Sequence, residues 1–229
     1  MKARYTISLF FLIILLGSIT PLNLFAQNTV STPATEYDSA MAREWMLQVY
    51  ELVRDNNINA PAASRVYAYT AVALYEGLVN GIPGNFSIGG AIDGLSLLPY
   101  PQDDIEYDFP AMANASISTV VNGLFEEAGA TDDTFTRIND MREKQTALRL
   151  EAVDADIVER SLALGDEIGE ALLDWISTDN YGPTRKLDYT IPTDEDYLWE
   201  ETTEGQHALE PFWNQIRPFA LGYPERCNE

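Results

Sequence analysis

The chain has 229 residues, of which 36 are acidic and 14 are basic, and its formal net charge at pH 7 is −22. A surface with this charge repels phosphate backbones and anionic lipid, which argues against nucleic acid or a membrane surface as a partner. The length suits one domain, or a large part of one, with a substantial buried core.

Residues 1–26 have the layout of a secretory signal peptide. Lys2 and Arg4 precede an apolar run over residues 7–16, and the small residue Ala26 stands at the expected cleavage position. A membrane anchor is the alternative, but the run is short against the roughly 20 residues of a spanning helix. No cysteine follows it, so a lipoprotein modification has no attachment point. We therefore expect an exported chain, periplasmic or secreted, with no membrane contact after signal cleavage.

The exported part divides into a polar leader over 27–35, which we expect to be flexible, and a helical domain over 36–229. Helical periodicity appears in five segments of that domain: 36–56, 59–81, 109–129, 132–152 and 154–180.

The second helical segment is the most informative. Asn59 is a candidate N-cap, Pro61 stands in the first turn, and Gly81 follows the end. Between Ala62 and Val79 only four side chains are clearly polar, among them Arg65 and Glu76. A helix that is apolar nearly all round lies inside a bundle. Arg65 and Glu76 are three turns apart and cannot touch, so each needs a partner from elsewhere if it is buried.

Two segments lack periodicity. Residues 81–109 are rich in Gly, Pro and Asp and predict a long irregular loop, which either carries function or wraps the core. After Tyr181 the pattern breaks again, and we expect an extended segment laid over the helices. The predicted fold is all-α: a bundle of about five principal helices with a long irregular loop and an extended C-terminal segment.

Motifs for metal or nucleophilic chemistry are missing from the sequence. It has no HExxH, CxxC, helical ExxH pair, EF-hand spacing or G-x-S-x-G elbow. The single histidine, His207, is expected to be a loop residue and neither a ligand nor a base. The single cysteine, Cys227, cannot form an intrachain disulfide; it pairs between chains, stays free, or has its partner in missing sequence.

Arg217 and Pro218 invite comparison with an anion site. Such a site needs several converging cations and donors. The nearby cations, Arg185, Lys186 and Arg226, have no spacing that implies convergence. We expect Arg217 to anchor the tail against the helices.

Three segments, in this order, resemble vanadium-dependent haloperoxidase-like proteins of the phosphatidic-acid phosphatase type 2 superfamily. "RVYAYTAVALYEGLVNG" (65–81) resembles an early helix of these proteins, and "ALGDEIGEALLDWISTDNY" (163–181) resembles a later one. "LEPFWNQIRPFAL" (209–221) is similar to the segment that precedes their catalytic half. Together the three segments extend the resemblance over most of residues 40–229.

The resemblance implies a cationic cradle for vanadate or phosphate, built from Lys-x6-Arg-Pro, Pro-Ser-Gly-His-like and Ser-Arg-x5-His-like motifs. Glu210 stands where the lysine of the first motif would precede Arg217, and the other two motifs are missing. No catalytic, cofactor-binding or metal-binding residue is therefore carried over, and no cofactor is expected in this chain. The resemblance implies that the chain stops before the catalytic half, which is the expected partner, and that the complete enzyme uses vanadate if it is a haloperoxidase.

Two hypotheses about function remain. In the first, the chain is the N-terminal helical portion of an enzyme that oxidises halide with peroxide or hydrolyses phosphate esters, and it is inactive alone. In the second, it is a standalone periplasmic or secreted helical binding module, with its ligand where the loop at 81–109 meets the tail.

Overall fold

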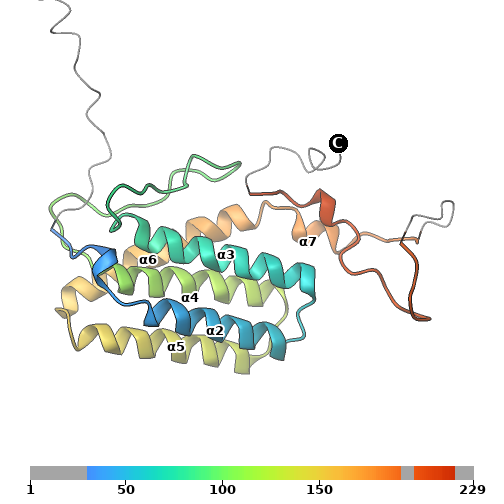
Figure 1. The fold of residues 1–229 in the computed structure, drawn as a ribbon, viewed down its shortest axis with the longest axis horizontal. Coiled ribbons are helices and arrows are strands. Elements are labelled where there is room, and N and C mark those ends of the chain that lie inside the picture. The colour runs from blue at the N-terminus through green and yellow to red at the C-terminus, as the bar shows by residue number, and fades with distance from the viewer. Residues whose placement is uncertain (1–29, 192–198, 220–229) are drawn as a thin grey trace, which may run out of the picture.

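The computed structural model describes residues 30–191 and 199–219, which form a bundle of helices (Figure 1). The predicted signal peptide at 1–26 lies outside the described residues, as does Cys227. The helices are α2 (Ala40–Asp55), α3 (Ala60–Val79), α4 (Phe109–Glu127), α5 (Asp132–Leu150), α6 (Ala155–Ile176) and the short α7 (Tyr181–Thr184), with 3-10 turns η1 (Ala34–Glu36) and η2 (Trp213–Gln215). Within the described residues there is no strand, and the prediction of an all-α bundle with five principal helices is confirmed.

The central helix of the bundle is α4. It contacts all four other long helices, and every residue from Phe109 to Ser118 is buried. The sequence explains this position, because no charged residue occurs between Phe109 and Phe125. The helix predicted to lie inside the bundle, α3, is buried along most of its length but flanks α4.

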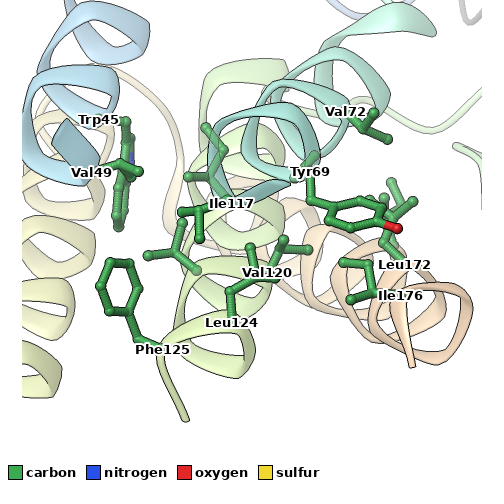
Figure 2. Packing of buried hydrophobic residues seen from close by; sticks show 14 of the residues in the cluster. Trp45, Val49, Tyr69, Val72, Ile117, Val120, Leu124, Phe125, Leu172 and Ile176 are labelled. Atoms are coloured by element: carbon green, nitrogen blue, oxygen red, sulfur yellow. The ribbon is translucent and has the colours of Figure 1, made fainter. Parts of the chain in front are cut away.

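Small residues let α3 and α6 approach α4 closely. A Cβ atom added at Gly165 of α6 would lie 2.1 Å from the carbonyl oxygen of Met112, and one at Gly77 of α3 would lie 2.5 Å from the Cα of Ala113. Neither position has room for a methyl group. The apolar side chains packed around these crossings come from four helices (Figure 2), and they include Trp45, Val49, Tyr69, Val72, Ile117, Val120, Leu124, Phe125, Leu172 and Ile176.

Two of the buried helices have a side-chain cap at the N-terminus. The predicted N-cap Asn59 is confirmed, because its Oδ1 accepts a hydrogen bond from the Ala62 N–H at 3.0 Å. Asp108 caps α4 in the same way, accepting from the Ala111 N–H at 2.9 Å. Each cap satisfies one of the N–H groups that have no partner in the first turn.

The first helix is shorter than expected. Helix α2 begins at Ala40 and not at residue 36, because the Asp38 carboxylate accepts from the Ala40 N–H at 2.6 Å and forms a turn before the helix. Residues 30–35, the described part of the predicted leader, make defined contacts with the bundle. The Ser31 Oγ accepts from the Tyr107 N–H at 2.8 Å, and the Ala34 N–H donates to the Gly81 carbonyl at 2.7 Å.

The loop between α3 and α4 wraps the core for part of its length. Leu95 and Leu98 are buried members of the core cluster, and the Trp175 indole N–H donates to the Asp93 carbonyl at 2.9 Å. The tail contacts the bundle mainly through residues 210–219, whereas residues 185–191 and 199–209 extend beyond the end of the helices (Figure 1). None of the described helices combines the length and apolar character needed to cross a membrane.

Candidate functional site

Buried charge gathers at one end of the bundle, where α3 meets the turn that follows α6. The Arg65 guanidinium donates through Nε to the Asp179 carboxylate at 2.6 Å and through Nη1 to Glu127 at 2.8 Å. The Tyr69 hydroxyl also donates to Asp179 at 2.8 Å, and the backbone N–H of Tyr181 donates to its other oxygen at 2.9 Å. Asp179 therefore accepts three hydrogen bonds while it is nearly inaccessible to solvent.

Local sequence places each member of this cluster. Arg65 and Tyr69 are four residues apart on α3, so they project from the same face. Asp179 lies in the turn between α6 and α7, and Asn180 after it has a left-handed backbone with φ of 74°. Asparagine tolerates this conformation better than most residues do. The turn redirects the chain and leaves the Asp179 side chain facing α3.

The pKa values of Arg65 and Tyr69 are both raised. Burial raises the pKa of the Tyr69 phenol, and the charge of Asp179 and its hydrogen bond raise it further. Burial works against the charged form of Arg65, but the hydrogen bonds and charges of Asp179 and Glu127 outweigh it and raise the pKa of Arg65. Arg65 therefore stays a cation and Tyr69 a neutral donor near neutral pH. This behaviour fits a structural ion network and not an acid–base pair.

Glu76 is a second buried charge, at the other end of α3. It accepts a hydrogen bond from the Ile88 N–H at 2.8 Å, which ties the α3–α4 loop to the bundle. Burial raises the pKa of the Glu76 carboxyl, and its hydrogen bonds offset only part of that effect. The expectation that Arg65 and Glu76 each need a partner from elsewhere is confirmed. No sequence signal identifies these partners, because Asp179 lies in a turn, Ile88 in a loop and Glu127 at the end of α4, and none of them belongs to a motif.

Arg217 anchors the tail, as predicted. Its Nη2 donates to the Trp175 carbonyl at 2.9 Å, and its Nη1 donates to the Thr178 hydroxyl at 2.6 Å. The Arg217 backbone N–H donates to the Asp179 carbonyl at 2.9 Å, and its guanidinium carbon lies 4.6 Å above the Trp175 ring. Cation–π contact adds to the hydrogen bonds. Phe219 completes the contact by packing on Trp175 and Tyr69.

A cleft of 360 Å³ lies between α3 and this anchored tail. One side is formed by α3 and the α6–α7 turn, and the other by the tail. Its lining residues are Ser64, Arg65, Ala68, Tyr69, Asp179, Trp213, Asn214, Ile216, Arg217, Pro218 and Phe219. The volume falls in the range of small-molecule pockets, roughly 300–1,000 Å³. Aromatic side chains and two guanidinium groups meet in this cleft.

The other cations considered from the sequence are not brought to this cleft. The Arg185 Nε lies 3.6 Å from the Glu210 carboxylate, and the Arg185 guanidinium lies over the ring of Tyr181. Lys186 and His207 are exposed, and Arg226 lies outside the described residues. Among the residues that the structure describes, no group of three or more His, Cys, Asp or Glu side chains is placed to hold a metal ion.

Comparison with solved structures identifies a bacterial vanadium-dependent iodoperoxidase with the same fold. The TM-score is 0.68 at 24% sequence identity, and the match covers 80% of this chain and 43% of the iodoperoxidase. This chain therefore spans less than half the length of that protein. No protein-family model and no curated protein matches the sequence. The described chain has the helical fold of part of a haloperoxidase-like protein.

Proposed function

We propose that the chain is the N-terminal helical portion of an exported vanadium-dependent haloperoxidase-like or acid phosphatase-like enzyme. The complete protein would oxidise halide with peroxide or hydrolyse phosphate esters, and the catalytic motifs would lie in the part of the enzyme beyond this chain. The observation that carries the proposal is the structural likeness to the iodoperoxidase over 80% of this chain. The order of the three family-like segments in the sequence supports it.

The role proposed for this chain is that of a scaffold. Its central helix is buried by four neighbours, and the buried Arg65–Asp179 pair fixes the turn to which the tail is anchored. The tail segment at 209–221 resembles the part that leads into the catalytic half. The anchoring of Arg217 would therefore set the direction in which the chain enters that half.

The described residues do not fit vanadate. An oxyanion of this kind needs several cations and a histidine at one point. Two of the three Arg217 side-chain nitrogens already donate to Trp175 and Thr178, Arg185 lies near Glu210, and His207 is exposed in a loop, so no histidine and no set of cations converges on one point. We therefore derive no catalytic step through vanadate in this chain, and we expect the chain to be inactive alone.

The inactivity is tested with the purified chain, orthovanadate and hydrogen peroxide. Iodide oxidation is followed by triiodide absorbance, and phosphatase activity by release of 4-nitrophenol from its phosphate ester. Both rates should equal those of vanadate without protein. Halide oxidation above that background would contradict the proposal that the catalytic motifs lie elsewhere. Sequencing the DNA beyond the Glu229 codon gives an independent check. We expect an open reading frame that encodes Lys-x6-Arg-Pro, and an immediate stop codon would contradict the proposal of a catalytic half.

A standalone helical binding module in the periplasm or outside the cell is the second candidate, and the cleft beside the anchored tail favours it. The α3–α4 loop also reaches the tail, since a Cβ atom at Gly94 would lie 3.2 Å from the Arg217 Nη1. A binding module should unfold cooperatively as a soluble monomer. A scaffold that lacks its catalytic half should expose apolar surface and bind hydrophobic dyes.

A further inference from the structure

Two guanidinium N–H groups at the cleft have no acceptor among the described residues. They are the Nη2 of Arg65 and the Nε of Arg217, and both atoms are buried. Arg65 is balanced by two carboxylates. The described partners of the Arg217 guanidinium are neutral oxygens, those of Trp175 and Thr178, and no described carboxylate forms an ion pair with it. A buried charged donor without an acceptor is costly, which makes these positions informative.

Asp179, the one carboxylate among the residues that line the cleft, is already engaged. The Asp179 carboxylate receives Arg65, the Tyr69 hydroxyl and the Tyr181 N–H. The Ser64 hydroxyl donates to the carbonyl of Pro61 at 2.6 Å. The cleft therefore offers a ligand the unpartnered N–H donors of Arg65 and Arg217 and the positive charge of Arg217. Its remaining walls are largely apolar, and they come from Ala68, Trp213, Ile216, Pro218 and Phe219.

From this arrangement we propose that the cleft binds a small monocarboxylic acid with an apolar body. The carboxylate accepts hydrogen bonds from Arg217 and Arg65, and the apolar body lies between α3 and the aromatic residues of the tail. Because both N–H groups are covered by protein atoms, binding requires the tail at 213–219 to move outward. A single negative charge fits better than a phosphate, since Asp179 is adjacent and the whole chain carries a net charge of −22. The inference is independent of the proposed enzyme and gives the binding-module hypothesis a ligand class.

The experiment compares cyclohexanecarboxylate with cyclohexylmethanol, which has the same ring and no charge. Isothermal titration calorimetry of the purified chain at pH 7 should show saturable binding of the acid at least tenfold tighter than of the alcohol. Equal affinities, or no binding of the acid, would overturn the proposal. Inorganic phosphate binding as tightly as the acid would also overturn it, because the site would then select charge alone.

Two variants locate the site on α3. Ala68→Trp fills the cleft from the helix side and leaves both arginines in place in the sequence, and it should weaken binding of the acid at least tenfold. Ala71→Trp is the matched control, since Ala71 is exposed on the same helix and does not line the cleft. The control should bind like the wild type. Unchanged affinity in Ala68→Trp would place the acid elsewhere and refute the site.

Arg217 variants test the charge. Arg217→Gln should reduce the preference for the acid over the alcohol to near unity, whereas Arg217→Lys should retain at least part of it. Loss of the tail anchor alone would affect acid and alcohol alike, so the ratio of the two affinities distinguishes recognition from tail release. An undiminished ratio in Arg217→Gln would show that Arg217 does not bind the carboxylate.

Discussion

Asp179 shows how one residue can connect three distant parts of the chain. Its side chain pairs with Arg65 and Tyr69 on α3, and its backbone carbonyl holds Arg217 of the tail. Both members of the Arg65–Asp179 pair are nearly inaccessible to solvent. A buried pair of this kind adds little net stability over an apolar alternative, but removing one partner leaves an uncompensated charge.

We therefore expect Asp179→Ala to lower the free energy of unfolding by about 3–5 kcal/mol. Glu127 remains near Arg65, but it is one-third exposed and cannot replace both contacts. Urea denaturation followed by circular dichroism measures the change. Asp174→Ala is the control, because Asp174 lies near the end of α6, just before the turn that carries Asp179, and is exposed; it should shift stability by no more than about 0.5 kcal/mol. A similar small shift in Asp179→Ala would show that the pair is dispensable.

Glu76 differs from Asp179 because its described hydrogen bonds come from uncharged groups. Burial raises the pKa of its carboxyl above the ordinary value of 4.5, so the folded state holds the proton more tightly than the unfolded state. The contribution of this group to stability is therefore greatest below pH 4.5 and is lost as pH rises through the folded-state pKa.

Replacing Glu76 by glutamine removes this titration. The free energy of unfolding of Glu76→Gln, relative to the wild type, should rise as pH increases from 4 to 7. The check is a series of urea denaturations of both proteins across that range. A difference that is constant with pH, or that falls with increasing pH, would contradict the raised pKa.

At the scale of elements, the bundle depends on how closely α6 and α3 approach α4. Gly165 and Gly169 lie one turn apart on α6, and a Cβ atom at Gly169 would lie 2.7 Å from the Thr119 Cβ. These positions set the separation of the two helices. The α4–α6 crossing in turn positions the α6 end, and with it the turn that carries Asp179.

Gly165→Ala should destabilise the bundle even though alanine favours helices by roughly 1 kcal/mol over glycine. The added methyl group would meet the Met112 carbonyl, and overpacking of this kind costs about 1–3 kcal/mol or more. Thermal or urea unfolding gives the value. Gly182→Ala serves as the control, because its Cβ atom would lie at an ordinary 3.4 Å from Glu127. Equal effects of the two substitutions would mean that helix separation is not limited at Gly165.

At the scale of the whole molecule, the dominant feature is the net charge of −22. Like charges spread over one surface repel one another and disfavour the compact state. Several described ion pairs, such as those of Arg137 with Glu51 and Asp55, cancel only a small part of this charge.

The melting temperature should therefore rise when salt screens the surface, by about 2–4 °C for each 1 kcal/mol gained. Differential scanning calorimetry at 0.02 M and 0.5 M sodium chloride, pH 7, measures the increase. At pH 4, where part of the carboxylates are protonated, the increase should be smaller. A melting temperature that falls with salt at pH 7 would show that attractive pairs outweigh the repulsion.

The sequence by itself determined the helices, because the signals that form them are local. Apolar periodicity and the Asn59 cap act within a few residues of one another, and they predicted five helices and the role of Arg217 as an anchor. Only the tertiary structure decided that α4 is central, that Arg65 pairs with Asp179 across 114 residues, and that a cleft opens beside the tail. These features depend on which helix faces meet and at what separation. Such contacts between distant segments leave no periodic pattern in the sequence.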